Sequence, residues 1–175
     1  NSLKDNLNFR SVNTVQKYLH HLEEAYIFFS LNRYSNKYKE QIKTSKKIYI
    51  IDNGYISAKA FQLSPNYGRL MENSVFLELI RKGYKPNFEL FYYKSKNNKE
   101  IDFVLKKGLT VESLIQVSYE INHIKTKKRE INALLESGQE LNCNNLIIIT
   151  YDYEAEEIHS DRKIIFIPLW RWLII

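Results

Sequence analysis

Two short runs decide the fold: EIDFVLK at residues 100–106 and LIQVSY at residues 114–119. Both read as β-strands, in which successive side chains point to opposite faces of the sheet. Strict alternation predicts that the two strands turn one polar set toward a common side, opposite an apolar set. The polar set is Glu100, Asp102, Gln116 and Ser118, and the apolar set is Ile101, Phe103, Ile115, Val117 and Tyr119.

The segments on either side of these runs alternate between helical and strand patterns. Residues 69–82 carry apolar side chains at helical spacing, with Gly83 as the helix terminator. A basic helix is expected from Lys125 to Glu136, stopping at Gly138. Further strands are expected at residues 90–94, 146–150 and 164–168. This order predicts an α/β (α+β) domain over residues 55–175, with a central mixed sheet flanked by helices.

The first part of the chain, residues 1–54, has a different pattern. An amphipathic helix is expected from Ser11 to Tyr26, after a shorter helix around Leu3 and Leu7. Strands at residues 28–34 and 47–51 flank a basic stretch. Two helices and a basic ribbon are the outline of a partial winged-helix, or helix-turn-helix, module. Nucleic-acid contacts would then fall near the start of the second helix, at Thr14, Gln16 and Lys17. Because winged helices also contact proteins, DNA binding and protein binding both stay open.

Composition says more about the location and the possible partners of the chain than about its activity. The chain has 175 residues, a formal net charge of +6 and a pI of about 9.2. This charge is compatible with a DNA partner and equally with a soluble, lysine-rich protein. Cys143 is the single cysteine, which favours a reducing, cytoplasmic location. We expect no membrane partner, since no apolar run approaches the roughly 18 residues of a membrane span. The sequence leaves the oligomeric state open.

The polar set predicts metal-dependent chemistry if it is completed by Glu72, which lies near the start of the helix at residues 69–82. Hydrolysis of a phosphodiester with Mg²⁺ needs carboxylate ligands and a group that orients the attacking water. Glu72, Asp102 and Glu100 are the expected metal ligands. The alternative is structural: Glu100 and Asp102 as solvated strand residues, Glu72 as a carboxylate at a helix N-terminus, and Gln116 with Ser118 as a hydrogen-bonded pair.

The motifs in order resemble a known domain. They are MENSVF at residues 71–76, YYK at 92–94, EIDFV at 100–104 and QVSY at 116–119. Together they resemble the PD-(D/E)XK nuclease-like domain, in the version found without an assigned function at the C-terminus of a group of prokaryotic AAA+ ATPases. Arg129-Glu130 and residues 146–151 also resemble that group. Residues 11–51 resemble the winged helix that precedes the domain there.

The resemblance implies a restriction-endonuclease-like sheet and a catalytic set of Glu72, Asp102 and Gln116. The set is degenerate, because Ser118 stands where the family has lysine and a neutral hydroxyl supplies no positive charge. Lys94 or Lys99, from a neighbouring strand or turn, is the expected substitute if one exists.

Three functions follow from this resemblance as expectations. The first is a non-catalytic module that binds nucleic acid or a partner protein for an ATPase. The second is a Mg²⁺-dependent nuclease with a rearranged site, and the third is a structural domain that packs on the ATPase during assembly. The chain contains no P-loop motif and does not begin with Met, so we expect the ATPase domain to lie upstream in a longer protein.

Overall fold

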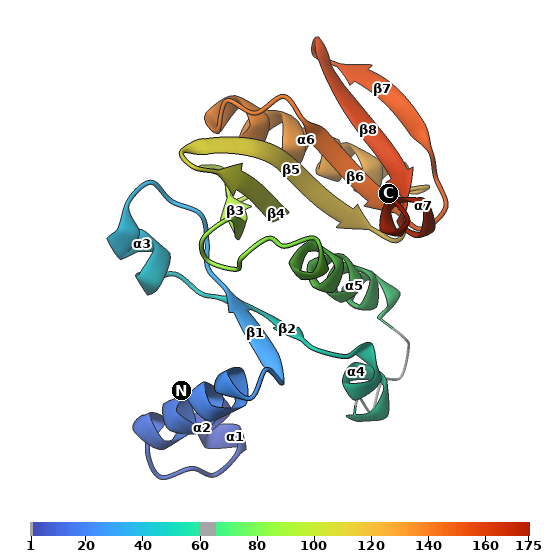
Figure 1. Ribbon diagram of the computed structural model, residues 1–175. Helices are drawn as coiled ribbons and strands as arrows, with labels where there is room; N and C mark the ends of the chain where they lie inside the picture. Colours follow the sequence, from blue (N-terminus) through green and yellow to red (C-terminus); the bar gives the residue numbers. More distant parts are fainter. Residues whose placement is uncertain (1, 60–65) are drawn as a thin grey trace.

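A computed structural model of the chain describes residues 2–59 and 66–175. Figure 1 shows two parts joined by a narrow ribbon: a small helical part at the N-terminus and a larger part built on a sheet. The helices are α1 (Ser2–Asn6), α2 (Val12–Glu24), α3 (Tyr38–Lys43), α4 (Asn53–Lys59), α5 (Tyr67–Arg81), α6 (Ile124–Glu140) and α7 (Leu169–Leu173). The strands are β1 (Phe28–Leu31), β2 (Lys47–Ile50), β3 (Leu90–Lys94), β4 (Glu100–Lys107), β5 (Thr110–Ser118), β6 (Leu146–Thr150), β7 (Ala155–His159) and β8 (Arg162–Pro168).

The larger part is a six-stranded mixed sheet in the order β3-β4-β5-β6-β8-β7. Strands β3, β4 and β5 form an antiparallel meander, β5, β6 and β8 run parallel, and β7 returns antiparallel to β8. The crossover from β5 to β6 is α6. This architecture confirms the prediction of an α/β fold with a central mixed sheet flanked by helices.

The two faces of the sheet bury separate cores. On one face, Ile131 and Leu134 of α6 pack with Leu114 of β5 and neighbouring strand residues. On the other face, Val75 and Phe76 of α5 pack against the sheet, together with Trp172 of α7 and residues of the β1–β2 ribbon. Figure 1 shows α6 on one side of the sheet, and α5 and α7 on the other. The ribbon therefore contributes to the core on the α5 face.

The prediction of strict alternation in residues 100–106 was wrong. Tyr93 pairs with Ile101, whereas Phe91 pairs with Val104, so β4 has one more residue than β3 between these two pairs. Ile101 and Val104 both pack in the α6-side core, while Phe103 packs in the α5-side core. An extra residue of this kind re-aims the side chains next to it. Here it leaves Ile101 and Phe103 on opposite faces.

The N-terminal part follows the predicted pattern in its main helix and its two strands. Ser11 caps α2, because its hydroxyl accepts from the Asn13 N–H at 3.1 Å. Strands β1 and β2 pair antiparallel, from Phe28↔Ile50 to Leu31↔Lys47. The basic stretch between the two strands contains α3, and a further helix that was not predicted, α4, follows β2.

The ribbon is also hydrogen-bonded directly to the large sheet. Beyond β1, the Tyr34 N–H donates to the Tyr92 carbonyl at 2.6 Å, and the Tyr92 N–H donates to the Asn32 carbonyl at 3.2 Å. Arg33 and Tyr92 thus form a parallel bridge at the outer edge of β3. One continuous segment pairs first with β2 and then with β3, so the position of the ribbon is coupled to that of the sheet.

Helix α6 continues past the glycine that was expected to end it. It runs to Glu140, and Gly138 lies inside it. A Cβ atom at position 138 would lie 2.9 Å from the Cys143 carbonyl oxygen, 2.7 Å from Nη1 of Arg162 and 3.0 Å from Cδ2 of Leu146. Glycine is therefore needed for close packing of the helix on the chain that follows, and not for helix termination. Gly83, by contrast, has the positive φ of 95° expected after a helix end.

Strand β7 and helix α7 were not predicted. Among the described residues, no helix combines the length and apolar character that crossing a bilayer requires.

Candidate functional site

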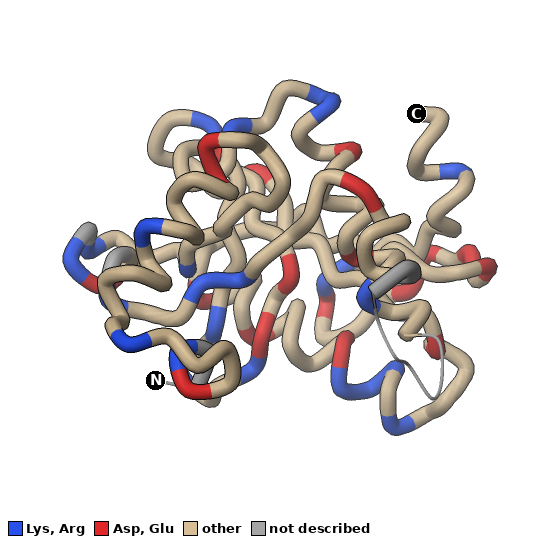
Figure 2. Tube along the Cα trace, turned by 90° about the horizontal axis from the view of Figure 1, so that it is seen from below, with Lys and Arg blue, Asp and Glu red and all other residues tan. Residues whose placement is uncertain are grey.

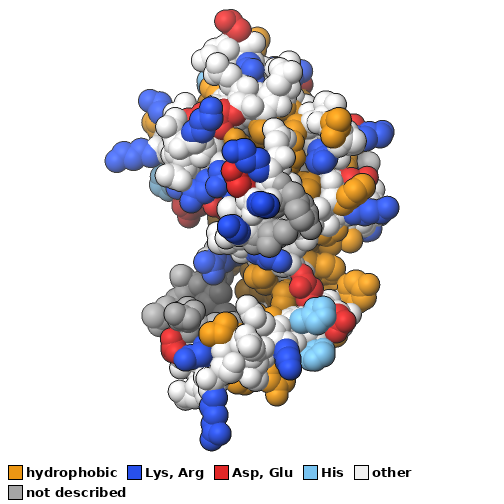
Figure 3. Space-filling view, turned by 90° about the vertical axis from the view of Figure 1, so that its left-hand side faces the viewer, with side chains coloured by type: hydrophobic (Ala, Val, Ile, Leu, Met, Phe, Trp, Pro, Cys, Tyr) orange, Lys and Arg blue, Asp and Glu red, His pale blue; other side chains and the backbone are white. Residues whose placement is uncertain are grey.

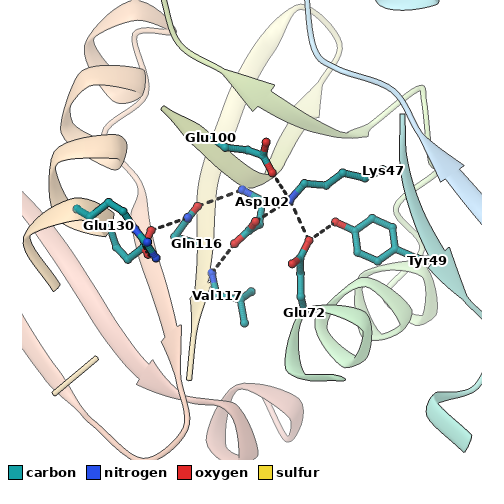
Figure 4. Close-up of polar contacts among 9 residues, drawn as sticks. Lys47, Tyr49, Glu72, Glu100, Asp102, Gln116, Val117 and Glu130 are labelled. Carbon is teal, nitrogen blue, oxygen red and sulfur yellow. Dashed lines mark hydrogen bonds and ion pairs between the residues drawn. The ribbon is translucent and has the colours of Figure 1, made fainter. Parts of the chain in front are cut away.

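A lysine lies at the centre of the carboxylates that the sequence pointed to. The Lys47 ammonium is 2.9 Å from Oε1 of Glu72, 2.9 Å from Oε1 of Glu100 and 2.7 Å from Oδ1 of Asp102. Figure 4 shows the three carboxylates directed at this one nitrogen, from α5 and from two positions of β4. We call Lys47, Glu72, Glu100 and Asp102 the Lys47 cluster.

The ribbon positions Lys47 through contacts with α5. Two residues after Lys47, Tyr49 is buried and stacks on Phe76 with ring centroids 4.1 Å apart. Its hydroxyl donates to Oε1 of Glu72 at 2.6 Å. The side-chain amide of Asn73 both accepts from the Ile50 N–H and donates to the Ile50 carbonyl, each at 2.9 Å. These contacts hold β2 against α5 and place the lysine at the start of the strand over the carboxylates.

Asp102 links the Lys47 cluster to β5, at the end of the ladder between β4 and β5. The last pair of the ladder at this end is Phe103↔Ile115. Beyond it, side chains bridge the strands: Oδ2 of Asp102 accepts from the Val117 N–H at 2.9 Å, and the Asp102 N–H donates to Oε1 of Gln116 at 3.1 Å. Both oxygens of the Asp102 carboxylate are therefore in use, one by the cluster and one by β5.

Gln116 belongs to the opposite face of the sheet. Its Nε2 donates to Oε2 of Glu130 on α6 at 2.7 Å, and Nε of Arg129 donates to Oε1 of the same glutamate at 3.0 Å. The amide oxygen of Gln116 is taken by the Asp102 N–H. Strand alternation places Ser118 on the same side as Gln116, and its side chain is buried.

The predicted polar set is therefore only partly assembled. Glu72, Glu100 and Asp102 come together on the α5 face, as predicted. The expectation that Gln116 and Ser118 share their side was wrong, because the extra residue in β4 turns Asp102 toward α5 while Gln116 and Ser118 stay on the α6 face. Within the described residues, no group of three His, Cys, Asp or Glu side chains has the arrangement of a metal site. Assignment of Glu72, Glu100 and Asp102 as metal ligands stays a prediction.

The lysine of the site was not among the residues selected from the sequence. Lys99, one expected substitute, pairs with Glu136 of α6 at 2.8 Å. The carbonyl of Lys94, the other, accepts from Arg33 of the segment that follows β1. The single local signal for Lys47 is its place at the start of a strand, and many lysines share such a position.

Burial and the neighbouring charges shift the ionisation of the cluster. Burial, followed by the charge of Glu72, raises the pKa of Asp102 to about 7, although Lys47 and the Val117 N–H oppose this. Burial alone would lower the pKa of Lys47, but the charges of Asp102 and Glu72 raise it above its ordinary value. Burial and the same carboxylates hold the pKa of the Tyr49 hydroxyl well above its usual value. Lys47 therefore stays charged, and Asp102 takes up the proton on acidification.

A cavity of about 460 Å³ opens beside the cluster. Its lining combines the ribbon and α5 with charged groups of both signs: Lys47, Ile48, Tyr49, Ile50, Ile56, Arg69, Glu72, Asn73 and Glu100. The cluster is therefore within reach of solvent on this side, and the Glu100 side chain is 45% exposed.

The candidate nucleic-acid residues lie on α2, away from the cluster. Gln16 and Lys17 are exposed, and Thr14 is half-buried. Basic residues are spread over the chain: Figure 2 shows Lys and Arg in every part of the trace with Asp and Glu among them. On the face drawn in Figure 3, they are interleaved with apolar and acidic side chains. DNA contacts at Thr14, Gln16 and Lys17 stay a prediction.

Comparisons with known proteins place the chain among uncharacterised relatives. Residues 1–66 match a domain of unknown function, DUF8612. The chain is 42% identical over 164 residues to an uncharacterized protein of Methanocaldococcus jannaschii, covering 90% of this chain and 35% of that protein. It is 31% identical over 160 residues to an uncharacterized protein of Haemophilus influenzae, covering 91% of this chain and 37% of that protein. The chain thus spans little more than a third of the length of these relatives. No solved structure matches it. Because residues 67–172 match the domain of unknown function DUF4143, the chain belongs to that family.

Proposed function

We propose that this chain is a non-catalytic, nuclease-like module of a longer ATP-binding protein of the AAA+ class, in which it binds a partner protein. In this proposal, residues 55–175 are a degenerate PD-(D/E)XK domain and residues 1–54 a partial winged helix. The order of motifs supports the assignment, as does the mixed sheet with α5 before the meander. The relatives are long enough to hold a further domain.

The observation that carries the proposal is that oxygens of the candidate site residues already contact other groups of the protein. Metal-assisted hydrolysis needs oxygens free to bind the ion. In the Lys47 cluster, one oxygen each of Glu72, Glu100 and Asp102 contacts Lys47, and the second oxygen of Asp102 accepts from Val117. The amide oxygen of Gln116 accepts from the Asp102 backbone. These contacts stabilise the joint between the ribbon and the sheet, which is a structural use of the residues.

A second candidate function is a working Mg²⁺-dependent nuclease. One specific observation favours it: Lys47 brings to Asp102 the positive charge that Ser118 cannot supply at the family's lysine position. In that case Glu72, Glu100 and Asp102 would hold the ion, and Lys47 would orient the attacking water from the ribbon.

A cleavage assay separates the two candidates. The chain is incubated with single- and double-stranded DNA in Mg²⁺ and in Mn²⁺, beside Asp102→Ala and Lys47→Met. Glu112→Ala, which removes an exposed carboxylate of β5, is the matched control. We expect no cleavage above the level of the Asp102→Ala sample. Cleavage that Asp102→Ala and Lys47→Met abolish, and Glu112→Ala retains, would establish the nuclease.

The salt dependence of DNA binding tests whether the partner is DNA or a protein. Phosphate contacts by Lys and Arg make affinity fall steeply as salt rises. We expect weak binding without sequence preference, and no weakening specific to Thr14→Ala, Gln16→Ala or Lys17→Ala. Tight binding that the α2 variants abolish would assign the module to DNA instead of a protein.

A further inference from the structure

Parallel strands bring several aromatic residues to one edge of the sheet. Strands β5, β6 and β8 run in the same direction, so their carboxyl ends meet at that edge. Tyr119 follows β5 and Tyr151 follows β6 directly, and Trp170 lies in α7 just after β8. Figure 1 shows β5 and β8 ending beside α7, with α5 nearby. Loops at the carboxyl ends of parallel strands are where α/β sheets commonly bind their ligands.

Three tyrosines form a continuous row at this edge. Tyr67, the first residue of α5, stacks on Tyr119 with centroids 5.1 Å apart and planes at 26°. Tyr119 contacts Tyr151 at 5.0 Å and 54°. Tyr67 is 50% exposed and Tyr151 55% exposed, with the half-buried Tyr119 between them. We call these three residues the tyrosine row. Exposed aromatic groups in mutual contact are typical of binding surfaces, since a ring gives a large contact area at small entropic cost.

The charges beside the tyrosine row are negative. Glu120 directly follows Tyr119, Asp152 directly follows Tyr151, and both carboxylates are exposed. Burial raises the pKa of the Tyr119 hydroxyl, and the neighbouring tyrosines, Glu120 and Asp152 raise it further. His123 approaches Glu120 only at 3.9 Å. Phosphates would be repelled here, whereas a cation would meet aromatic faces and carboxylates together.

We propose that the tyrosine row binds an arginine side chain carried by a basic segment of a partner protein, with Glu120 and Asp152 as its carboxylate contacts. A planar guanidinium stacks on a tyrosine face and at the same time donates paired hydrogen bonds to a carboxylate, which a lysine ammonium does less well. The inference rests on the partner-binding role proposed above and gives that role a location. The surface shares no residue with the Lys47 cluster.

The test is a titration of the chain with the peptide Gly-Arg-Gly-Arg-Gly, followed by NMR of ¹³C-labelled tyrosine rings. The matched peptide carries citrulline, which keeps the planar shape without the charge. We expect saturable shifts of the Tyr67, Tyr119 and Tyr151 signals with the arginine peptide. The citrulline peptide should bind about two- to fivefold more weakly, because it has no positive charge to be attracted to the ring faces.

Substitutions test whether the arginine peptide binds at the tyrosine row. Tyr151→Ala, and separately Glu120→Gln with Asp152→Asn, should each weaken arginine binding at least about twofold. Tyr18→Ala, which removes an exposed tyrosine of α2, should leave it unchanged. Equal affinity for the citrulline peptide, no shift at the highest soluble arginine concentration, or shifts produced by a ten-nucleotide oligothymidine in place of arginine would each overturn the proposal. The DNA cleavage assay is independent of this titration, so failure here leaves the non-catalytic assignment standing.

Discussion

The ammonium of Lys47 lies 2.7 Å from Oδ1 of Asp102, although 55 positions separate the two residues in the sequence. The contact joins the first residue of β2 to the irregular part of β4, where an extra residue turns Asp102 toward α5. The N-terminal ribbon therefore supplies the positive charge that pairs with the carboxylate of Asp102 in the large sheet. Several consequences of this pairing can be measured.

Removal of the lysine should destabilise the fold. Lys47→Met keeps the length of the side chain but leaves Glu72, Glu100 and Asp102 without a cation, and loss of one partner from a largely buried ion pair costs about 3 kcal/mol. The free energy of unfolding is measured in urea. Lys46→Met, at the exposed neighbouring position, should change it by less than about 0.5 kcal/mol. Equal effects of the two substitutions would argue against the cluster.

Asp102 should make stability fall as the pH rises. Burial and the charge of Glu72 raise the pKa of Asp102 to about 7 in the folded chain, against about 3.9 for a free aspartate. The folded chain therefore holds a proton that the unfolded chain has lost between these values. The stabilisation is complete below pH of about 4 and is lost as the pH rises through about 7.

The measurement compares urea unfolding of the natural chain and Asp102→Asn at pH 5 and pH 8. The natural chain should lose stability relative to the variant by up to about 1.4 kcal/mol per pH unit between the two pKa values. Titrating groups outside the Lys47 cluster are common to both proteins and cancel. A difference that stays constant with pH would contradict the assignment of the proton to Asp102.

Glu157 on the edge strand β7 should act with the opposite sign. Burial would raise the pKa of its carboxyl, but hydrogen bonds from Lys127, Tyr153 and His159 bring it down to about 2. Its stabilisation is therefore present above the unfolded value of about 4.3 and is lost as the pH falls toward 2.

Glu157→Gln should cost about 1–2 kcal/mol at pH 6, and the cost should shrink toward zero near pH 2. The control is Glu156→Gln, which removes a carboxylate that is 62% exposed and should have little effect at either pH. Thermal unfolding followed by circular dichroism at pH 6 and pH 2 measures both. A pH-independent cost of Glu157→Gln would be the contrary result.

A glycine pair tests the packing of α6. Alanine is intrinsically better than glycine inside a helix by about 1 kcal/mol. At Gly138, however, its Cβ would lie 2.9 Å from the backbone oxygen of Cys143, so Gly138→Ala should destabilise the chain by about 1–3 kcal/mol. At Gly68, in the first turn of α5, the nearest atom is 3.7 Å away, so Gly68→Ala should be neutral or stabilising. Stabilisation by both substitutions would show that the chain around Gly138 has room for a methyl group.

Local sequence patterns were sufficient to predict the helices and strands that have a clear pattern of apolar residues. The strands predicted at residues 90–94 and 146–150 have the same bounds in the structure, and α5 was placed within two residues at its start. Short elements were missed. Strand β7 has the sequence AEEIH, and its charged residues suit an exposed edge strand but interrupt the apolar alternation by which a strand is recognised. Helix α7 has five residues, which are too few to show a helical period.

The candidate site could be predicted only in part, for physical reasons. Glu72, Glu100 and Asp102 could be grouped from the sequence because residues 100 and 102 lie two positions apart in one strand and Glu72 lies near the start of the expected helix. The error over Gln116 came from the extra residue in β4, which depends on how β3 pairs with it and leaves no mark in the run EIDFV. Lys47 was missed because its role arises when the ribbon packs on α5 through Tyr49 and Asn73, contacts between distant parts of the chain.

The central claim is that the carboxylates of Glu72, Glu100 and Asp102 pair with Lys47 and not with a metal ion. It is tested most directly by calorimetric titration of Mn²⁺ into the natural chain, Lys47→Met, and Lys47→Met combined with Asp102→Asn. We predict no saturable binding to the natural chain, and binding to Lys47→Met that the added Asp102→Asn removes. Saturable binding of Mn²⁺ to the natural chain that Asp102→Asn alone abolishes would contradict the claim and restore these carboxylates as a metal site.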